Sequence, residues 1–253
     1  MAEAYELWKA MSVAGEDITF WQNIYVKFYQ AFIEADRWKQ YLEGMATTLY
    51  VTVIAILIGI VLGVIVASIR TAHDQQRRKK NIVLGFFNAI CKIYVTVIRG
   101  TPMMVQLMIL GFVIFKSSRN FTMVGALGLG LNSGAYVAEI IRGGLMSLDR
   151  GQSEAGRSLG LGYMDTMRFI VVPQAFKAVL PALGNEFIIL LKDTSLLTII
   201  GGKELVHAAQ GIMNRTWEQM FPLLGISFLY LVMVLILSWL QGKLERRLRQ
   251  SER

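Results

Sequence analysis

Residues 45–69, MATTLYVTVIAILIGIVLGVIVASI, decide the fold class of this 253-residue chain, because they contain no Asp, Glu, Lys, Arg or His. A helix needs about 20 mostly apolar residues to cross the roughly 30 Å hydrocarbon core of a bilayer. It also satisfies its own backbone hydrogen bonds, which lipid requires. This stretch therefore predicts a membrane-spanning helix.

Four more apolar stretches follow the first. They are 101–115, which extends back toward residue 82, then 121–141, about 178–200, and FPLLGISFLYLVMVLILSWL at 221–240. Over the whole chain 54% of the residues are hydrophobic and 17% are charged, less charge than an ordinary soluble domain carries. We expect an all-α integral membrane protein with five transmembrane helices. Helix starts or kinks are expected at Pro102, Pro173 and Pro181.

Two shorter parts flank this membrane domain, which we place at 45–242. The N-terminal segment, 1–44, contains ITFWQNIYVKFYQAFIEADRWKQY at 18–41, where aromatic residues are mixed with charged ones. That composition suits a helix lying in the outer membrane interface. An ordinary amphipathic helix packed on the first span explains it equally well. The C-terminal tail, 243–253, is basic.

The basic residues predict how the chain is oriented. Five Lys or Arg fall in 70–80 against one acid, five in 142–177 against three, and five in 243–253 against two. With five spans these segments share one side of the membrane, and loops rich in Lys and Arg stay in the cytoplasm. We therefore expect the N-terminus outside and the C-terminus in the cytoplasm.

Several kinds of site are excluded by residue content. The single cysteine, Cys91, cannot form an intrachain disulfide, and His73 and His207 lie too far apart to suggest a metal site. No nucleophile and base set appears, so a membrane enzyme ranks last among the functions. The net charge of +8 lies in short loops rather than on one soluble face, which argues against nucleic acid.

The glycine-containing stretches favour helix packing over nucleotide binding. No phosphate-binding loop is present, because Gly202 and Lys203 are followed by Glu204 and lack the required preceding glycine. The run GALGLGLNSG at 125–134 opens an apolar span without a preceding strand, so it favours close helix packing over a dinucleotide site. Gly59 and Gly63 favour close packing for the same reason.

The cytoplasmic stretch RGQSEAGRSLGLGYMDTMRFIVVP, residues 150–173, predicts a docking element. Its pattern fits a short helix, a turn at Gly160 and Gly162, and a second helix that ends before Pro173. A short helix lying along the membrane can enter a groove of a soluble partner. Small residues would allow close approach, and Glu154 would supply a directional charge.

This stretch resembles the cytoplasmic EAA motif of the membrane subunits of ATP-binding cassette importers, which ends in I-x-L-P. The matching residues are Glu154, Ala155, Gly156 in place of the second alanine, Gly160, Ile170, Val172 in place of leucine, and Pro173. Over about 44–245 the chain is also similar to the polar amino-acid permeases of that family, through RGTPMMVQL at 99–107, SGAYVAEIIRGGL at 133–145, VVPQAFKAVLP at 171–181 and LLKDTSL at 190–196.

The resemblance implies a permease subunit in a prokaryotic inner membrane, with the EAA loop at about 143–173. Two permease subunits, identical or sisters, would form the translocation path for a polar amino acid. Cytoplasmic ATPase subunits would bind ATP and Mg²⁺ and dock on Glu154, Ala155, Gly156, Gly160 and Pro173, so this chain needs no cofactor. An external binding protein would deliver the substrate, and lipid would surround the spans.

Ionisable residues inside the spans need a partner or a watery path. Glu139 lies about one turn from Arg142, so we favour a structural pair over substrate contact. The remaining candidates are gate or structural residues: Arg99, Tyr136, Lys192, Asp193, Thr194 and Ser195.

Glu186 lies in PALGNEFIILL, within the fourth span, with no cation near it in the sequence. Its carboxylate could pair with the ammonium group of an amino-acid substrate, and in some members of the resembled family an acid at this position lines the substrate cavity. A hydrogen bond to the second permease subunit is the other interpretation, and both stay open.

A secondary transporter or channel that works without an ATPase is the alternative function. The odd number of spans, the lack of an evident inverted repeat and the docking element all argue against it.

Overall fold

In a computed structural model, which describes residues 2–76 and 81–250, the chain folds into helices, and these residues contain no strand. The α-helices are α1 (Ala2–Ala14), α2 (Phe20–Phe32), α3 (Arg37–Asp74), α4 (Ile82–Gly100), α5 (Met103–Met108), α6 (Phe121–Met146), α7 (Arg150–Ser158), α8 (Tyr163–Thr166), α9 (Val172–Asp193), α10 (Leu205–Thr216) and α11 (Met220–Gln250). Short 3₁₀ or π segments are η1 (Glu34–Asp36), η2 (Ile109–Ile114), η3 (Met167–Val171) and η4 (Thr194–Ile200).

Five helical stretches among the described residues are long and apolar enough to cross a membrane. They are Glu34–Asp74, Ile82–Gly100, Phe121–Met146, Tyr163–Ile200 and Met220–Leu248. The all-α class and the number of spans are therefore confirmed. Four of them are longer than the apolar stretches that predicted them, the second span being the exception, and α3 crosses the expected boundary at residues 44 and 45.

The second span is where the prediction was wrong. We expected 101–115 to be its core, but the spanning helix is α4, and Met103–Ile114 is a separate short apolar helix. Thr101 is extended between them, with φ −119° and ψ 148°. The cause is Pro102, because a proline disfavours helical backbone in the residue before it.

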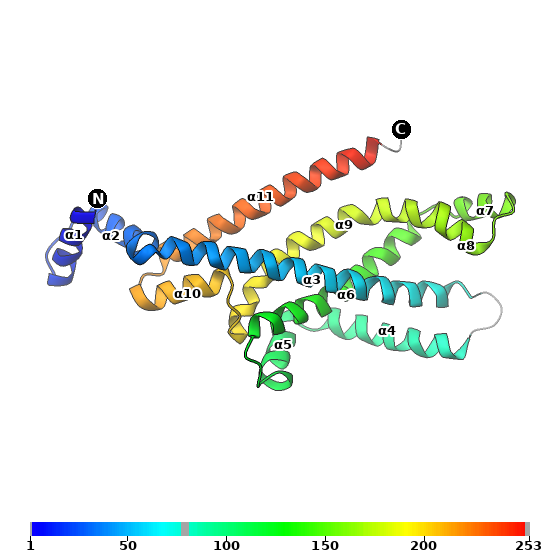
Figure 1. The fold of residues 1–253 in the computed structure, drawn as a ribbon, viewed down its shortest axis with the longest axis horizontal. Coiled ribbons are helices and arrows are strands. Elements are labelled where there is room, and N and C mark those ends of the chain that lie inside the picture. The colour runs from blue at the N-terminus through cyan, green and yellow to red at the C-terminus, as the bar shows by residue number, and fades with distance from the viewer. Residues whose placement is uncertain (1, 77–80, 251–253) are drawn as a thin grey trace.

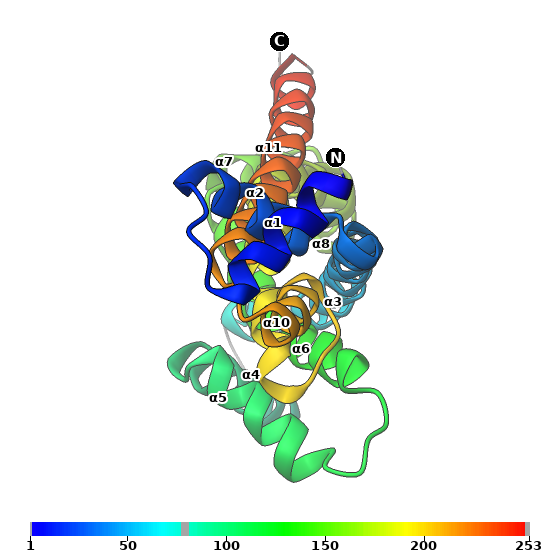
Figure 2. The ribbon, with the colours of Figure 1, turned by 90° about the vertical axis from the view of Figure 1, so that its left-hand side faces the viewer.

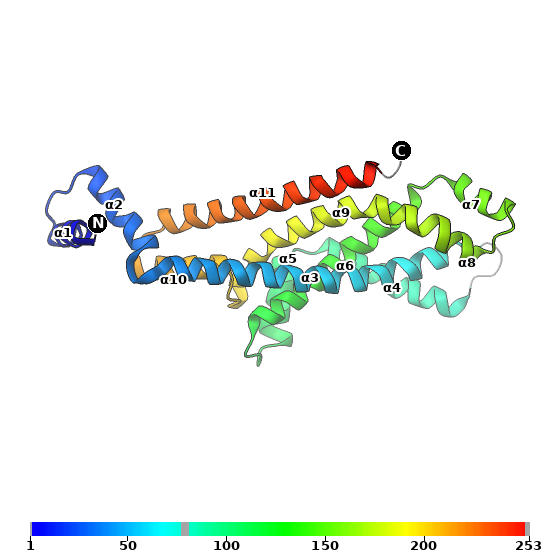
Figure 3. The same ribbon diagram turned by 45° about the horizontal axis from the view of Figure 1, so that its top comes forward.

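The helices are arranged along one long axis (Figure 1). The C-terminal end of α3, the start of α4, and helices α7 and α8 gather at one end, toward which α11 also runs, as Figure 3 shows from another side. Helices α1, α2 and α10 lie at the opposite end. The C-terminal end of α3 thus lies at the same end of the molecule as α7 and α8, and which end faces the cytoplasm stays a prediction.

Helices α3 and α6 form the closest pair in the core. A Cβ atom on Gly59 would lie 2.7 Å from Ser133 Oγ, and one on Gly130 would lie 2.7 Å from Ile58 Cβ. No side chain fits at either place without a shift, so the glycines let the two helices touch. This agrees with the packing interpretation of the run at 125–134.

The N-terminal segment forms a helical hairpin instead of one helix. Helix α2 ends at Phe32, and the chain bends at Ala35 and Asp36, where φ is 53° and 55°, before α3 begins. The rings of Phe32 and Tyr41 lie 5.4 Å apart, so α2 packs on the start of the first span. That contact favours the packed-helix interpretation of 18–41. Figure 2 views the molecule from this end, with α1 and α2 in front of the bundle.

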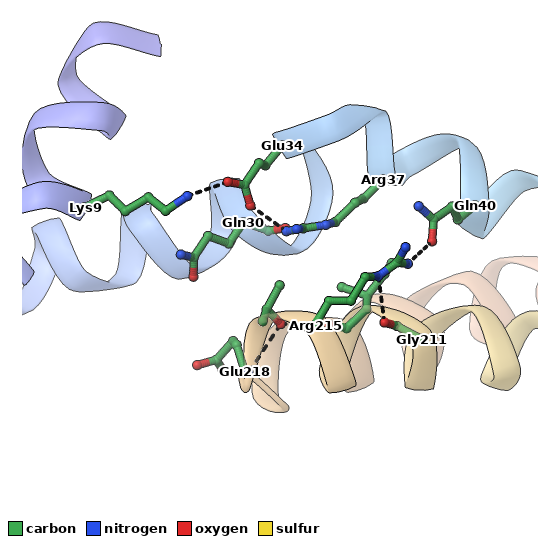
Figure 4. A network of polar contacts seen from close by, with 10 residues as sticks. Lys9, Gln30, Glu34, Arg37, Gln40, Gly211, Arg215 and Glu218 are labelled. Carbon is green, nitrogen blue, oxygen red and sulfur yellow. Dashed lines mark hydrogen bonds and ion pairs between the residues drawn. The ribbon is translucent and has the colours of Figure 1, made fainter. Parts of the chain in front are cut away.

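Ion pairs fix this hairpin to the rest of the chain (Figure 4). Glu34 receives Lys9 Nζ of α1 at 2.5 Å and Arg37 Nη1 of α3 at 2.7 Å. Nearby, Arg215 Nε of α10 donates to the Gly211 carbonyl at 2.9 Å, and its guanidinium also donates to Gln40 of α3. The segment before the first span is therefore a packed part of the fold.

Candidate functional site

The docking element begins at α7 with a side-chain cap. Asp149 Oδ1 accepts a hydrogen bond from the Gly151 backbone N–H at 2.9 Å, which satisfies one free donor of the first turn. At the other end Gly160 has a φ of +78°, and the Leu161 N–H donates to the Gly156 carbonyl at 3.0 Å. The turn predicted at Gly160 is present, in a backbone conformation that suits glycine. Gly162 instead precedes α8 with a φ of −65°.

The second helix of this element does not end before Pro173, as the sequence suggested. Helix α8 continues through the π segment η3 into α9, and Pro173 lies in the first turn of α9. A proline removes one helical hydrogen bond, and here it lies just after the π segment, where the regular i to i−4 pattern is already interrupted. The docking element is therefore continuous with the fourth span.

One face of α7 is buried and the other is exposed. Gly156 is buried, and a Cβ on it would lie 2.8 Å from Thr166 Cγ2. Glu154 and Ala155 are exposed. The turn and α8 add large exposed side chains, with Leu159 79% and Met164 75% exposed. Exposed large apolar side chains and an exposed carboxylate within one short segment suit a protein partner.

Two side-chain hydrogen bonds attach the element to the spans. Gln174 Nε2 of α9 donates to Gln152 Oε1 of α7 at 3.0 Å. The Tyr163 hydroxyl of α8 donates to Gln75 Oε1, next to the C-terminal end of α3. Motion of α7 and α8 would therefore act on two different spans.

Deeper in the bundle, Glu139 of α6 contacts three guanidinium groups. Arg142 Nη2 lies 2.9 Å from Glu139 Oε2, the pair that the sequence predicted. Arg70 of α3 pairs with Glu139 Oε1, and Arg99 Nη1 of α4 lies 3.9 Å from Oε2. The Arg99 guanidinium also stands over the Tyr136 ring, 5.2 Å from its centroid. Three helices thus meet at one carboxylate.

Glu186 has a different environment. It is 6% exposed, and Ser133 Oγ of α6 donates a hydrogen bond to its Oε1 at 2.9 Å. Among the described residues no ion pair reaches this carboxylate. A buried acid held by one hydroxyl keeps the capacity to accept from a cation.

The other candidates stand at the C-terminal end of α9. Lys192 is exposed, while Asp193 and Ser195 are half-buried. Thr194 is buried and donates to the Leu191 carbonyl at 2.7 Å, a structural contact. In the part of the chain that the structure describes, no hydrogen bond or ion pair joins these residues to Glu186.

Sequence reasoning missed Glu204 as a structural residue. Glu204 is only 1% exposed. Its carboxylate caps α10 by accepting hydrogen bonds from the backbone N–H groups of Val206 and His207, each at 2.8 Å. It also accepts from the hydroxyl of Thr198 and, at 3.1 Å, from the hydroxyl of Tyr230. Burial raises the pKa of Glu204, although these hydrogen bonds favour its charged form. An acid just before an apolar helical run is the signal that could have revealed this cap.

Comparison with known proteins identifies the family. The family model described as "Binding-protein-dependent transport system inner membrane component" matches residues 83–250. The chain belongs to this family. It is a multi-pass membrane subunit of an ATP-binding cassette importer and not itself an enzyme, so the secondary transporter and channel alternative is not favoured.

Relatives cover most of the chain. The arginine transport system permease protein ArtQ of Bacillus subtilis (strain 168) is 35% identical over 216 residues, 83% of this chain and 93% of the relative. The glutamine transport system permease protein GlnP of Escherichia coli (strain K12) is 34% identical over 212 residues, 82% of this chain and 92% of the relative.

Solved structures agree with the fold. One chain of an amino acid ABC transporter, in a structure with histidines, matches with a TM-score of 0.74 and 36% identity over 83% of this chain and 94% of its own length. An inward-facing MetNI methionine ABC transporter matches with a TM-score of 0.70, covering 86% of this chain and 99% of that one, at 18% identity. The second likeness supports the fold alone.

Proposed function

We propose that the chain is the permease subunit of an importer for a polar amino acid, and that it forms the translocation path together with a second permease subunit. Support comes from the relatives, whose names specify arginine and glutamine transport. An external binding protein delivers the substrate, and ATP and Mg²⁺ are bound by cytoplasmic ATPase subunits. Whether the second permease is a copy or a sister chain is a separate question.

The observation that carries the coupling role is the geometry of α7 and α8. Glu154 and Ala155 are exposed, as are the large apolar side chains of the turn and α8, while Gly156 packs α7 against Thr166. Gly160 makes the turn, and Pro173 starts the helix that leads to the substrate path. ATPase motion at this surface is passed to α9 through η3 and to α3 through Tyr163.

Glu186 is the substrate residue in this proposal. An α-ammonium group is present on every amino acid, and among the described residues the hydrogen-bond partner of the Glu186 carboxylate is the neutral Ser133. A charged group at membrane depth is costly unless it is paired or faces water. A cation that arrives with the cargo meets that need. Arg99, Tyr136 and Glu139 stabilise the bundle or gate the path, as do Lys192 to Ser195.

The test is purification of the chain from membranes followed by reconstitution. We expect an ATPase subunit to purify with it, and ATP-dependent uptake of arginine, histidine, glutamine or glutamate when the binding protein is added. Uptake driven by an ion gradient without ATP would contradict the proposal.

Orientation is tested by labelling. Single cysteines at Gln75 and Asn23, in a Cys91→Ser background, are exposed to a membrane-impermeant reagent in intact cells. Because α2 and the C-terminal end of α3 lie at opposite ends of the molecule, and the segment 70–80 is rich in Lys and Arg, we expect labelling at position 23 and none at position 75. Labelling at position 75 from outside would reverse the predicted topology.

A further inference from the structure

An apolar groove of about 330 Å³ lies where α2, the start of α3 and the start of α11 meet, at the end of the molecule opposite the docking element (Figure 1, Figure 3). Its volume falls within the range of small-molecule sites, about 300–1,000 Å³. The lining residues are apolar or aromatic, among them Phe28 and Phe32 of α2, Trp38 and Leu42 of α3, and Phe228 of α11. The groove is therefore separate from the candidate sites described above.

A glycine lets α2 approach α11 and close the floor of the groove. A Cβ atom on Gly225 would lie 2.7 Å from Phe32 Cζ, so no larger residue fits there without a shift. Phe32 in turn packs on Tyr41 of α3, with 5.4 Å between the ring centroids. The walls stay open, because Trp38 is 45% exposed and Phe228 is 65% exposed. Three helices thus form an apolar groove that the described residues leave uncovered.

The two walls of the groove lie at different depths in the membrane. On α3, residues 34–43 contain five charged residues, whereas 44–69 contain none, so Trp38 lies at the level of the lipid headgroups. On α11, Phe228 lies about two turns inside the uncharged stretch 221–240. The groove therefore leads from the polar interface into the hydrocarbon.

A cation stands at the interfacial rim of the groove. Lys39 Nζ lies 5.5 Å from the centroid of the Trp38 ring and 2.6 Å from Asp36 Oδ2. Both members of this ion pair are exposed, and an exposed pair contributes little to stability. Lys39 is therefore able to exchange Asp36 for an anionic ligand. Tryptophan and lysine at the end of a span are also typical anchors at the level of lipid headgroups.

We propose that this groove binds one glycerophospholipid. The lipid phosphate accepts from Lys39 Nζ, the glycerol backbone lies against Trp38, and one acyl chain runs past Leu42 and along Phe228 into the hydrocarbon. A molecule with an anionic head and an apolar chain matches both the cation at the rim and the apolar lining. A purely apolar protein segment would match the lining and leave the cation unmatched. With the predicted orientation, the lipid belongs to the outer leaflet.

Such a lipid would hold the N-terminal hairpin on the bundle. Its chain contacts α2, α3 and α11 together, and these helices otherwise meet at the floor of the groove, through Phe32. Filling the groove removes apolar surface of all three helices from the polar interface, which stabilises their contact. The bound lipid is thus a structural ligand of the permease, and substrate does not compete for it.

Binding is measured on the purified permease and ATPase complex. After exchange into excess detergent, native mass spectrometry counts the phospholipid retained by each permease chain, and phosphatidylglycerol is then titrated back. Lys39→Glu reverses the charge at the rim, and Leu42→Trp fills the groove. We expect each variant to bind phosphatidylglycerol about tenfold more weakly than the wild type, the usual effect of losing one charge-assisted hydrogen bond. Equal affinity in the wild type and Lys39→Glu overturns the proposal.

Two matched variants control for general effects on lipid binding. Lys203→Glu reverses an exposed cation outside the lining, and Leu57→Trp enlarges an exposed leucine of α3 outside the lining. Both should keep wild-type affinity for phosphatidylglycerol. If they lose as much affinity as Lys39→Glu and Leu42→Trp, the lipid belongs to the general layer around the spans, and the proposal fails. Because Lys39 is exposed, Lys39→Glu tests the site even where Leu42→Trp does not fold.

Cross-linking separates a lipid from a protein in the groove. Leu42→Cys in a Cys91→Ser background is treated in membranes with a short bifunctional thiol reagent. We expect no link between two permease chains, and we expect added phosphatidylglycerol to raise the unfolding temperature of the delipidated wild type more than that of Lys39→Glu. Efficient linkage of two permease chains through position 42, with an equal rise in both proteins, would show that a second subunit covers the groove and would overturn the proposal.

Discussion

Two acids on membrane-spanning helices, Glu139 and Glu186, have opposite surroundings. Glu139 contacts guanidinium groups from α3, α4 and α6, all supplied by its own chain. Glu186, on α9, is held by the neutral hydroxyl of Ser133. Removing the charge of Glu139 leaves three guanidinium groups without a counter-charge. Removing the charge of Glu186 by substitution with Gln leaves Ser133 an oxygen to which it can still donate.

This difference separates a structural acid from one that is available to a ligand. A carboxylate neutralised inside the chain stabilises the contact of three helices and has little capacity left for substrate. A buried carboxylate with one neutral partner is costly to keep, and a cation delivered by the substrate offsets that cost. The two acids should therefore respond differently to the same substitution.

The largest effect is expected for Glu139→Gln. The change leaves Arg70, Arg99 and Arg142 close together without a counter-charge. These pairs are partly buried, so the cost should lie between the roughly 0–1 kcal/mol typical of an exposed pair and the about 3–5 kcal/mol of a fully buried one. We expect a severe loss of purified complex and a lower unfolding temperature. Glu139→Asp, which keeps the charge, is the control and should recover part of the yield. Normal yield and stability of Glu139→Gln would show that the cluster is not structural.

The next largest effect is expected for Glu154→Lys, which extends the comparison to an exposed acid. Because Glu154 faces away from the spans, the substitution should leave membrane insertion and stability intact. Uptake should fall at least tenfold and become uncoupled from ATP hydrolysis, since a charge reversal at a docking surface costs about 2 kcal/mol or more. Uptake and hydrolysis are measured together in proteoliposomes, with Glu154→Asp as the conservative control. Wild-type uptake in well-expressed Glu154→Lys would remove this residue from the coupling surface.

These differences also explain which features could be read from the sequence. The spans were predictable because lipid accepts only long apolar helices, as at 45–69. The bounds of the second span were not, because apolar residues continue on both sides of Pro102. Within the Glu139 cluster, Arg142 was found because it lies three positions away on the same helix. Arg70 lies 69 positions from Glu139 in the sequence, and only the fold brings these two residues into contact.

The docking element shows the same limit at shorter range. Its turn was predictable, since a glycine in the motif fits the positive φ at Gly160. Its join to the fourth span was not, because a proline can either end a helix or be accommodated beside a π segment within a continuous one. At Pro173 the second case holds. Ser133, the partner of Glu186, lies 53 positions away and carries no local signal.

A moderate effect is expected for Glu186→Gln, which keeps the shape and removes the charge. If the carboxylate meets the substrate, uptake should fall several-fold and preference should shift away from basic amino acids. Assembly with the ATPase and basal hydrolysis should survive. Arginine, histidine, glutamine and glutamate are compared beside complex yield. Unchanged relative rates across these four, with a drop in yield, would make Glu186 structural like Glu139.

The smallest effect is expected for Ser133→Ala, which tests the partner instead of the acid. The variant removes the one hydrogen bond to Glu186 Oε1 among the described residues, a contact usually worth about 1–2 kcal/mol when the acceptor is charged. Gly59 lies against Ser133, so Ala, being smaller than Ser, fits without a clash.

If Glu186 binds the substrate cation, loss of the hydrogen bond from Ser133 leaves the Glu186 carboxylate more dependent on that cation. Stability without substrate should then fall slightly, and the rise in unfolding temperature on adding arginine should be larger than in the wild type. A smaller rise than in the wild type would mean that the serine orients Glu186 for the substrate, and an unchanged rise would mean that arginine does not reach this carboxylate.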